Sequence, residues 1–263
     1  MFDLQIPITD LTVKQMKADL AKVLLNVKSS HRVEAMARGL GFRTYASMLA
    51  ISQIPRELRK ADGISFKNYL ENRGFNVGPP AFYQVVARAA IRSVLDAVPV
   101  LTSAGIGIGP PRRNTEGKWE TARQRNSRFA EWQGELLDSE QQFLLALAFV
   151  SRIKKIKTIG SGRGSYGLKH VAEKYVCTFP TGEQLGPQYV SNGALIAAAV
   201  HCGFHFKKYV DHLGYDELNV SFNMSKKSTD ELDLTVRPNG AFAQDMKRQQ
   251  EMRRLRQMGF STP

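Results

Sequence analysis

The sequence contains very little cysteine. Only Cys177 and Cys202 occur among its 263 residues, which is too few for the disulfide framework that stabilises small secreted proteins. We therefore expect two reduced thiols, as in a cytoplasmic protein. The first residues also lack a basic segment followed by an apolar one, so they predict no signal peptide.

Long apolar runs are missing as well. The longest, residues 143–150 and 194–200, fall far short of the roughly 20 residues that a membrane-spanning helix needs. The sequence thus predicts no contact with the membrane interior and a cytoplasmic location.

Acidic residues are scarce relative to basic ones. The chain has 24 Asp and Glu against 37 Lys and Arg, a formal net charge of +13, while 43% of its residues are hydrophobic. That apolar content can form a core, so global disorder is not expected. The excess positive charge favours polyanionic partners: nucleic acid, an acidic protein or an anionic membrane surface.

Helical periodicity dominates the first 60 residues. Apolar positions predict helices over 9–27, 31–38 and 44–51, with Thr9 or Asp10 capping the first and Thr44 the third. Between the second and third, Gly41 is expected to form a turn, because Leu40 and Phe42 on either side must both face inward. Residues 1–60 therefore predict a three-helix unit.

The rest of the chain predicts three further regions. Residues 61–155 indicate helices over 65–70, 81–97 and 139–153, with a Gly/Pro-rich loop at 99–111, a polar stretch over 115–137 and a capping box at Ser139-x-x-Gln142. Residues 156–240 indicate helices over 168–174 and 189–201 and strands over 175–179, 218–222 and 232–236. Residues 241–263 are predicted to form a basic helix or a tail. The predicted fold class is mainly α with a small late β component (α+β).

Residues 34–50, EAMARGLGFRTYASMLA, have the pattern of a helix-turn-helix. A small Ala37 allows close helix approach, and Gly41 allows the turn. The run resembles the Ala-x-x-x-Gly-Phe turn of AraC-type activators, although Ser47 stands where that pattern has an apolar residue. If the unit binds DNA, Arg43, Thr44 and Ser47 should face solvent. The alternative is a helical hairpin that only packs.

The segment 151–174, SRIKKIKTIGSGRGSYGLKHVAEK, combines basic residues with a glycine-rich loop. Gly162-x-Gly164-x-x-Gly167 has the spacing of a dinucleotide fingerprint, but no βαβ unit is predicted around it. A loop leading into a helix can still offer N–H groups to a phosphate, and an exposed tyrosine can stack on a base. The candidate phosphate- and base-contacting residues are Arg152, Lys154, Lys155, Lys157, Arg163, Tyr166 and Lys169.

Arg163 stands between two glycines, so its replacement is expected to report contact with a ligand and to leave the fold intact. A second basic group precedes this segment. It consists of Arg112, Arg113, Arg123, Arg125 and Arg128, within the loop and polar stretch already described. The alternative for both groups is a solvated surface without a ligand.

Two stretches resemble accessory proteins of bacterial plasmids and integrative elements. They are residues 65–107, with FKNYLENRGF and ARAAIRSVL, and residues 160–206, with SYGLKHVAEKY and YVSNGALIAAAVHCGF. The resemblance implies a role with a mobile element or phage. It carries no residue roles with it.

The sequence gives only weak support for a catalytic or metal-binding site. His201 and His205 have a helical ligand spacing, but Gly203 between them should end the helix, and the Glu of a His-Glu-x-x-His motif is missing. No Gly-x-Ser-x-Gly elbow occurs. We therefore expect no catalytic site, no metal and no cofactor.

Together these patterns predict a nucleic-acid-binding accessory protein of a mobile element, with DNA favoured over RNA, that uses basic surfaces to hold phosphates. The alternative is an inhibitor or adaptor whose basic face docks on an acidic protein, and an unidentified enzyme is a third option. The oligomeric state is left open.

Overall fold

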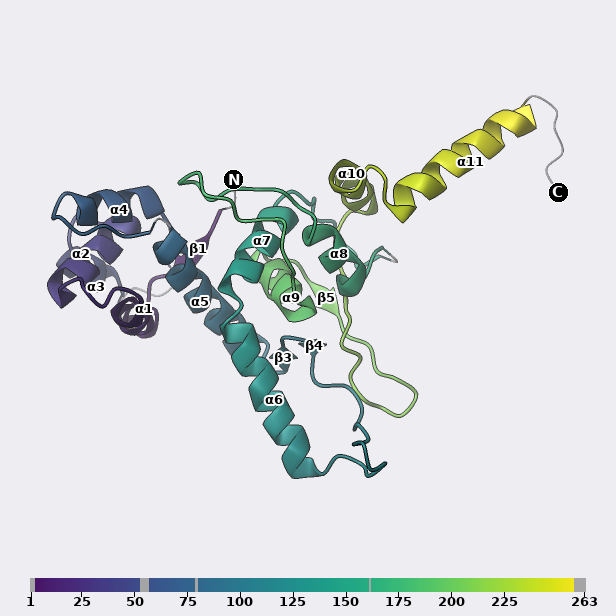
Figure 1. The fold of residues 1–263 in the computed structure, drawn as a ribbon, viewed down its shortest axis with the longest axis horizontal. Helices are drawn as coiled ribbons and strands as arrows, with labels where there is room; N and C mark the ends of the chain where they lie inside the picture. Colours follow the sequence, from purple (N-terminus) through teal and green to yellow (C-terminus); the bar gives the residue numbers. More distant parts are fainter. Residues whose placement is uncertain (1–2, 53–56, 79, 161, 258–263) are drawn as a thin grey trace.

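The computed structural model describes residues 3–52, 57–78, 80–160 and 162–257 (Figure 1). Helices make up most of this part of the chain, joined by two-stranded antiparallel sheets. The predicted fold class, mainly α with a small β component, is confirmed. Among the described residues, no helix is both long and apolar enough to cross a bilayer.

The amino-terminal helices are α1 (Asp10–Val23), α2 (Ser29–Gly39) and α3 (Tyr45–Ser52). Thr9 caps α1 as predicted, because its hydroxyl accepts a hydrogen bond from the Thr12 N–H at 3.1 Å. Gly41 has φ +79° in the turn after α2, with Leu40 and Phe42 buried on either side. The predicted three helices and their glycine turn are therefore confirmed.

A sheet that sequence patterns did not reveal lies beside these helices. Strand β1 (Gln5–Pro7) pairs antiparallel with β2 (Leu58–Lys60), with Ile6 opposite Arg59. The β component is thus not confined to the late part of the chain. Strands of three residues are too short to show an alternating pattern.

Helices α4 (Gly63–Glu71) and α5 (Pro80–Ala97) connect this region to the rest of the molecule. Gly39 at the end of α2 permits the contact, since a Cβ there would lie 2.6 Å from the ring of Phe82 on α5. An ion pair adds to it: Arg92 on α5 holds Asp19 on α1.

The centre of the molecule is formed by α5, α7 (Glu140–Val150) and α9 (Asn192–His201), as Figure 1 shows. Both α7 and α9 are apolar on nearly every side, which is expected of helices that are surrounded by protein. Their residues join one continuous apolar core that extends from Leu4 to Leu232.

Helix α6 (Ala122–Leu137) forms in the stretch described above only as polar. Its capping box is Thr121 with Gln124, whose side chains and backbones bond reciprocally. The box predicted at Ser139 and Gln142 was wrong. The Ser139 hydroxyl donates to the Leu136 carbonyl instead, and Gln142 Oε1 accepts from the Ser191 N–H.

The Gly/Pro-rich loop contains a small hairpin, β3 (Leu101–Thr102) with β4 (Gly105–Ile106). It packs against the start of α9, where Gly193 lies so close that a Cβ would sit 1.8 Å from the Thr102 carbonyl oxygen. Only glycine fits at that position.

The last part of the described chain holds α8 (Ser165–Ala172), β5 (Phe206–Lys207), β6 (Ser221–Phe222), α10 (Lys226–Val236) and α11 (Ala241–Gln257). The predicted strand at 232–236 was wrong, because it is the end of α10. The predicted strand at 175–179 is a turn segment with one bridge, Thr178 to Gln184. The carboxy-terminal residues 241–257 are helical and project away from the body (Figure 1).

Candidate nucleic-acid interface

Three extended segments from distant parts of the sequence lie side by side in the carboxy-terminal half. β5 pairs with β6 through Phe206 and Phe222. On the other edge of β6, Lys155 bridges to Met224, the Ile156 N–H donates to the Asn223 carbonyl at 2.9 Å, and the Ser225 N–H donates to the Lys154 carbonyl at 2.9 Å. The three segments form a small antiparallel ribbon.

Asn223 in the central segment joins the other two with its side chain. Its Oδ1 accepts from the His205 N–H at 2.7 Å, and its Nδ2 donates to the Ile156 carbonyl at 2.9 Å. The Asn223 side chain is buried. Its amide supplies the donor and the acceptor that the flanking backbones need, so it fixes their spacing.

Positive charge gathers on this ribbon. Residues 152–160, 203–210 and 219–227 contain no Asp or Glu. Their basic residues are Arg152, Lys154, Lys155, Lys157, Lys207, Lys208, Lys226 and Lys227, all exposed. We call Arg152, Lys154, Lys157, Lys207 and Lys208 the basic ribbon, because none of these five forms an ion pair within the described chain, whereas Lys226 and Lys227 pair with Asp230 and Glu231.

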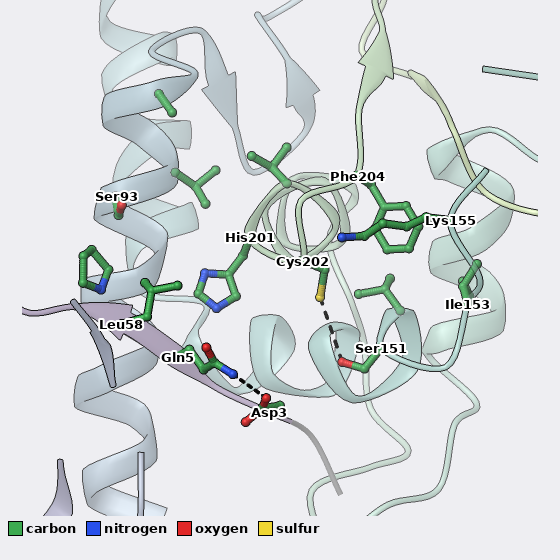
Figure 2. A pocket seen from close by; sticks show the side chains of 15 residues that line it. Asp3, Gln5, Leu58, Ser93, Ser151, Ile153, Lys155, His201, Cys202 and Phe204 are labelled. Carbon is green, nitrogen blue, oxygen red and sulfur yellow. Dashed lines mark hydrogen bonds between the residues drawn. The ribbon is translucent and has the colours of Figure 1, made fainter. Parts of the chain in front are cut away.

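Lys155 differs from its neighbours in direction. Its ammonium lies 5.4 Å from the centre of the Phe204 ring, and Figure 2 shows it reaching toward Cys202 at the rim of a cavity. Lys155 therefore belongs to the cavity, apart from the basic ribbon.

The glycine-rich loop before α8 is attached to the same ribbon. The Ser165 N–H donates to the Val220 carbonyl at 2.8 Å, and the Val220 N–H donates to the Ser165 hydroxyl at 3.1 Å. Every sheet among the described residues is antiparallel, so the βαβ unit of a dinucleotide site does not surround Gly162, Gly164 and Gly167 there.

Arg163 does not stand free in this loop, contrary to our expectation. Its guanidinium pairs with Asp233 and, at 3.4 Å, with Asp230, both on α10. It also lies over the Phe242 ring of α11 at 4.4 Å. Arg237 holds the other oxygen of Asp233. Arg163 thus ties the loop to the last two helices, which argues against the expectation that its replacement leaves the fold intact.

Burial alone would raise the pKa of Asp233, but the bonds from Arg237 and Arg163 outweigh it and hold this pKa below its ordinary value. A carboxyl group with a lowered pKa in the folded state contributes stability above its unfolded pKa of about 4, and this contribution is lost as pH falls. Asp233 and its two arginines therefore stabilise the fold at neutral pH.

We expect Arg163→Ala to lower the free energy of unfolding by about 2–3 kcal/mol at pH 7, because the buried Asp233 carboxylate keeps only Arg237. The pKa of Asp233 should rise, so the difference from wild type should shrink as pH falls below about 4. Urea unfolding at pH 7 and at low pH measures both effects. If the variant is as stable as wild type, Arg163 becomes a candidate for ligand contact again.

Lys169 and Tyr166 also differ in exposure. Lys169 is only 6% exposed, and its ammonium binds Glu173 at 2.8 Å, which withdraws it from contact with a phosphate. Tyr166 is 55% exposed and stands edge-on to His170, with ring centres 4.6 Å apart. Of these two candidates, only Tyr166 is exposed to solvent.

The five arginines of the second basic group also differ in exposure. Arg128 is buried, binds Glu120 with two nitrogens and donates to the Ile108 carbonyl at 2.7 Å. Its hydrogen bond is the main reason that the pKa of Glu120 is lowered. Arg125 donates to the Gly109 carbonyl at 3.0 Å. These two arginines attach the loop before α6 to that helix, so they have a packing role.

The other three arginines of that group are exposed. Arg112 lies over the Trp132 ring at 4.7 Å, and Arg113 lies over the 60% exposed Trp119 ring at 4.4 Å. Arg123 extends from the first turn of α6. In Figure 1 the loop before α6 lies at the foot of that helix, away from β5.

Arg43, Thr44 and Ser47 are exposed at the start of α3, as the DNA-binding interpretation requires. The Thr44 hydroxyl accepts from the Ser47 N–H at 3.0 Å, and the Ser47 hydroxyl accepts from the Thr44 N–H at 3.2 Å. Both hydroxyls thus cap α3, and this satisfies the packing interpretation equally. Figure 1 places α3 at the opposite end of the molecule from α11.

The histidine and cysteine residues do not assemble into a metal site. Gly203 has φ +73° and ends α9, as predicted, so His201 and His205 do not share a helix face. Among the described residues, no three of the His, Cys, Asp and Glu side chains are grouped to hold a metal ion.

Comparison of the chain with protein-family models, with curated proteins and with solved structures gave no match. The ribbon therefore has to be interpreted from its own residues. Sequence patterns missed Lys207, Lys208 and Asn223, although the Lys-Lys pair after a short apolar stretch was a usable signal.

Proposed function

We propose that this chain is a nucleic-acid-binding protein and that the basic ribbon holds the phosphate backbone. The observation that supports the proposal is that three segments without acidic residues meet in one antiparallel ribbon and carry five exposed cations that form no ion pair within the described chain. A polyanion gains affinity from such a group because each neutralised phosphate releases condensed counterions.

Aromatic residues beside the cations extend this argument. Tyr209 follows the ribbon lysines, with the Lys207 ammonium 5.4 Å from its ring, and is 36% exposed. Exposed aromatic rings next to cations suit unpaired bases, which stack on them without sequence preference. The resemblance of residues 65–107 and 160–206 to plasmid-borne accessory proteins is consistent with a nucleic-acid role on a mobile element, with DNA favoured.

A second function, docking on an acidic protein, is favoured by one observation. The turn after the ribbon, held by Asp211 Oδ1 accepting from the Leu213 and Tyr215 N–H groups, presents Val210 and Leu213 at 62% and 67% exposure. Exposed apolar side chains beside lysines are typical of protein interfaces.

Fluorescence anisotropy with a 20-base-pair DNA duplex and the matching single strand, titrated from low to high salt, tests the first function. If the five cations contact phosphates, log K should fall against log salt with a slope between about −3 and −5. Poly-glutamate of similar length serves as the acidic-protein probe. Tight binding of poly-glutamate without binding of either DNA would reject the nucleic-acid proposal in favour of the second function.

A further inference from the structure

A cavity of about 630 Å³ lies where the carboxy-terminal ends of α5, α7 and α9 meet β1 (Figure 2). Its volume falls within the usual range for small-molecule sites, roughly 300–1,000 Å³. Most of its walls are apolar, and they come from Val94, Val150, Val200, Phe204 and Leu58. The cavity takes no part in the basic ribbon beyond sharing the segment that carries Lys155.

Of the two charged groups at the cavity, Asp3 is in an ion pair within the described chain and Lys155 is not. Asp3 lies 3.1 Å from the Lys60 ammonium and accepts a hydrogen bond from Gln5. Lys155 lies over Phe204 and close to the ends of α7 and α9, where the negative ends of the helix dipoles favour a cation. A ligand therefore meets a carboxylate that is already paired and an ammonium whose charge the helix ends offset in part.

The remaining polar groups are neutral. Burial lowers the pKa of His201 to about 4 and raises the pKa of Cys202. The Cys202 sulfur pairs with the Ser151 hydroxyl at 3.9 Å. The His201 ring packs on Phe143 and faces the cavity in Figure 2, and its nitrogens have no hydrogen-bond partner within the described chain. A neutral imidazole offers one donor and one acceptor.

We propose that this cavity binds an uncharged, mainly apolar organic molecule that exchanges a hydrogen bond with the His201 imidazole. Apolar walls supply the affinity, and the unpartnered ring supplies one oriented polar contact. A charged ligand would lose its hydration, while Asp3 is already paired and the helix ends offset part of the Lys155 charge.

Three naphthalene compounds that differ in charge test this site: 2-naphthylmethanol, 2-naphthoate and 2-naphthylmethylammonium. Calorimetry should show that the alcohol binds, with both ions at least about tenfold weaker. The alcohol should also slow methylthiolation of Cys202 by methyl methanethiosulfonate, while Cys177, which lies outside the cavity lining, reacts at an unchanged rate. Peptide masses report both thiols.

A cavity-filling variant gives the matched control. Ala97 lines the cavity and is exposed on α5, so Ala97→Leu should fold normally and remove both binding and protection. Ala130→Leu, at an exposed position of α6 that does not line it, should bind as wild type does. Absence of binding by the alcohol, equal binding of either ion, or unchanged binding by Ala97→Leu would each overturn the proposal.

Discussion

Replacement of Lys154, Lys157 and Lys207 together by glutamine is expected to weaken DNA binding about 10²–10³-fold at 50 mM salt and to flatten the log–log salt slope by about two to three units. Lys154 and Lys157 belong to one outer segment of the ribbon and Lys207 to the other, and all three are exposed. Since none forms an ion pair within the described chain, the melting temperature should stay near that of wild type.

This experiment must separate the effect of the lost net charge from the effect of where the three lysines lie. Lys14, Lys17 and Lys22 on α1 are exposed and form no ion pair in the described chain, and their replacement by glutamine removes the same three charges. We expect that variant to keep most of the wild-type slope. If both triple variants lose affinity equally, binding depends on overall charge and the ribbon has no special part in it.

Local sequence signals were sufficient to predict most of the helices. Thr9, Gly41 and Gly203 mark helix ends through caps and positive φ, and these depend on a few neighbouring residues. The region 232–236 was misassigned because Leu232, Leu234 and Val236 alternate as in a strand. In the structure Asp233 between them is buried and paired with Arg163 and Arg237, a contact that spacing along the chain does not reveal.

The candidate site was less accessible to sequence reasoning for the same reason. Lysine-rich residues 152–157 could be recognised, but their neighbours Lys207 and Lys208 join them only through strand pairing with 221–225. Strands of two residues have no pattern of their own. Conversely, Arg128, Arg163 and Lys169 had the right chemistry for phosphate, and their acidic partners could be identified only from the fold.

Arg92→Ala is expected to lower the free energy of unfolding by about 3–5 kcal/mol, the largest loss that we predict for a single substitution here. Asp19 on α1 is 4% exposed, and Arg92 on α5 holds both of its oxygens, with Nη2 at 3.2 Å from Oδ1. Without the guanidinium, a carboxylate remains buried without its counter-ion. Urea unfolding of the variant measures the loss.

Two further variants decide whether burial is the cause of that loss. Lys67→Ala breaks an exposed pair with Glu71 on one helix and should cost at most about 0.5 kcal/mol. The double variant Asp19→Ala, Arg92→Ala removes both charges and should be more stable than Arg92→Ala alone, since no charge stays buried. A double variant that is as unstable as the sum of both single variants would show that the residues act independently. In that case the ion pair would contribute nothing to the joining of α1 and α5.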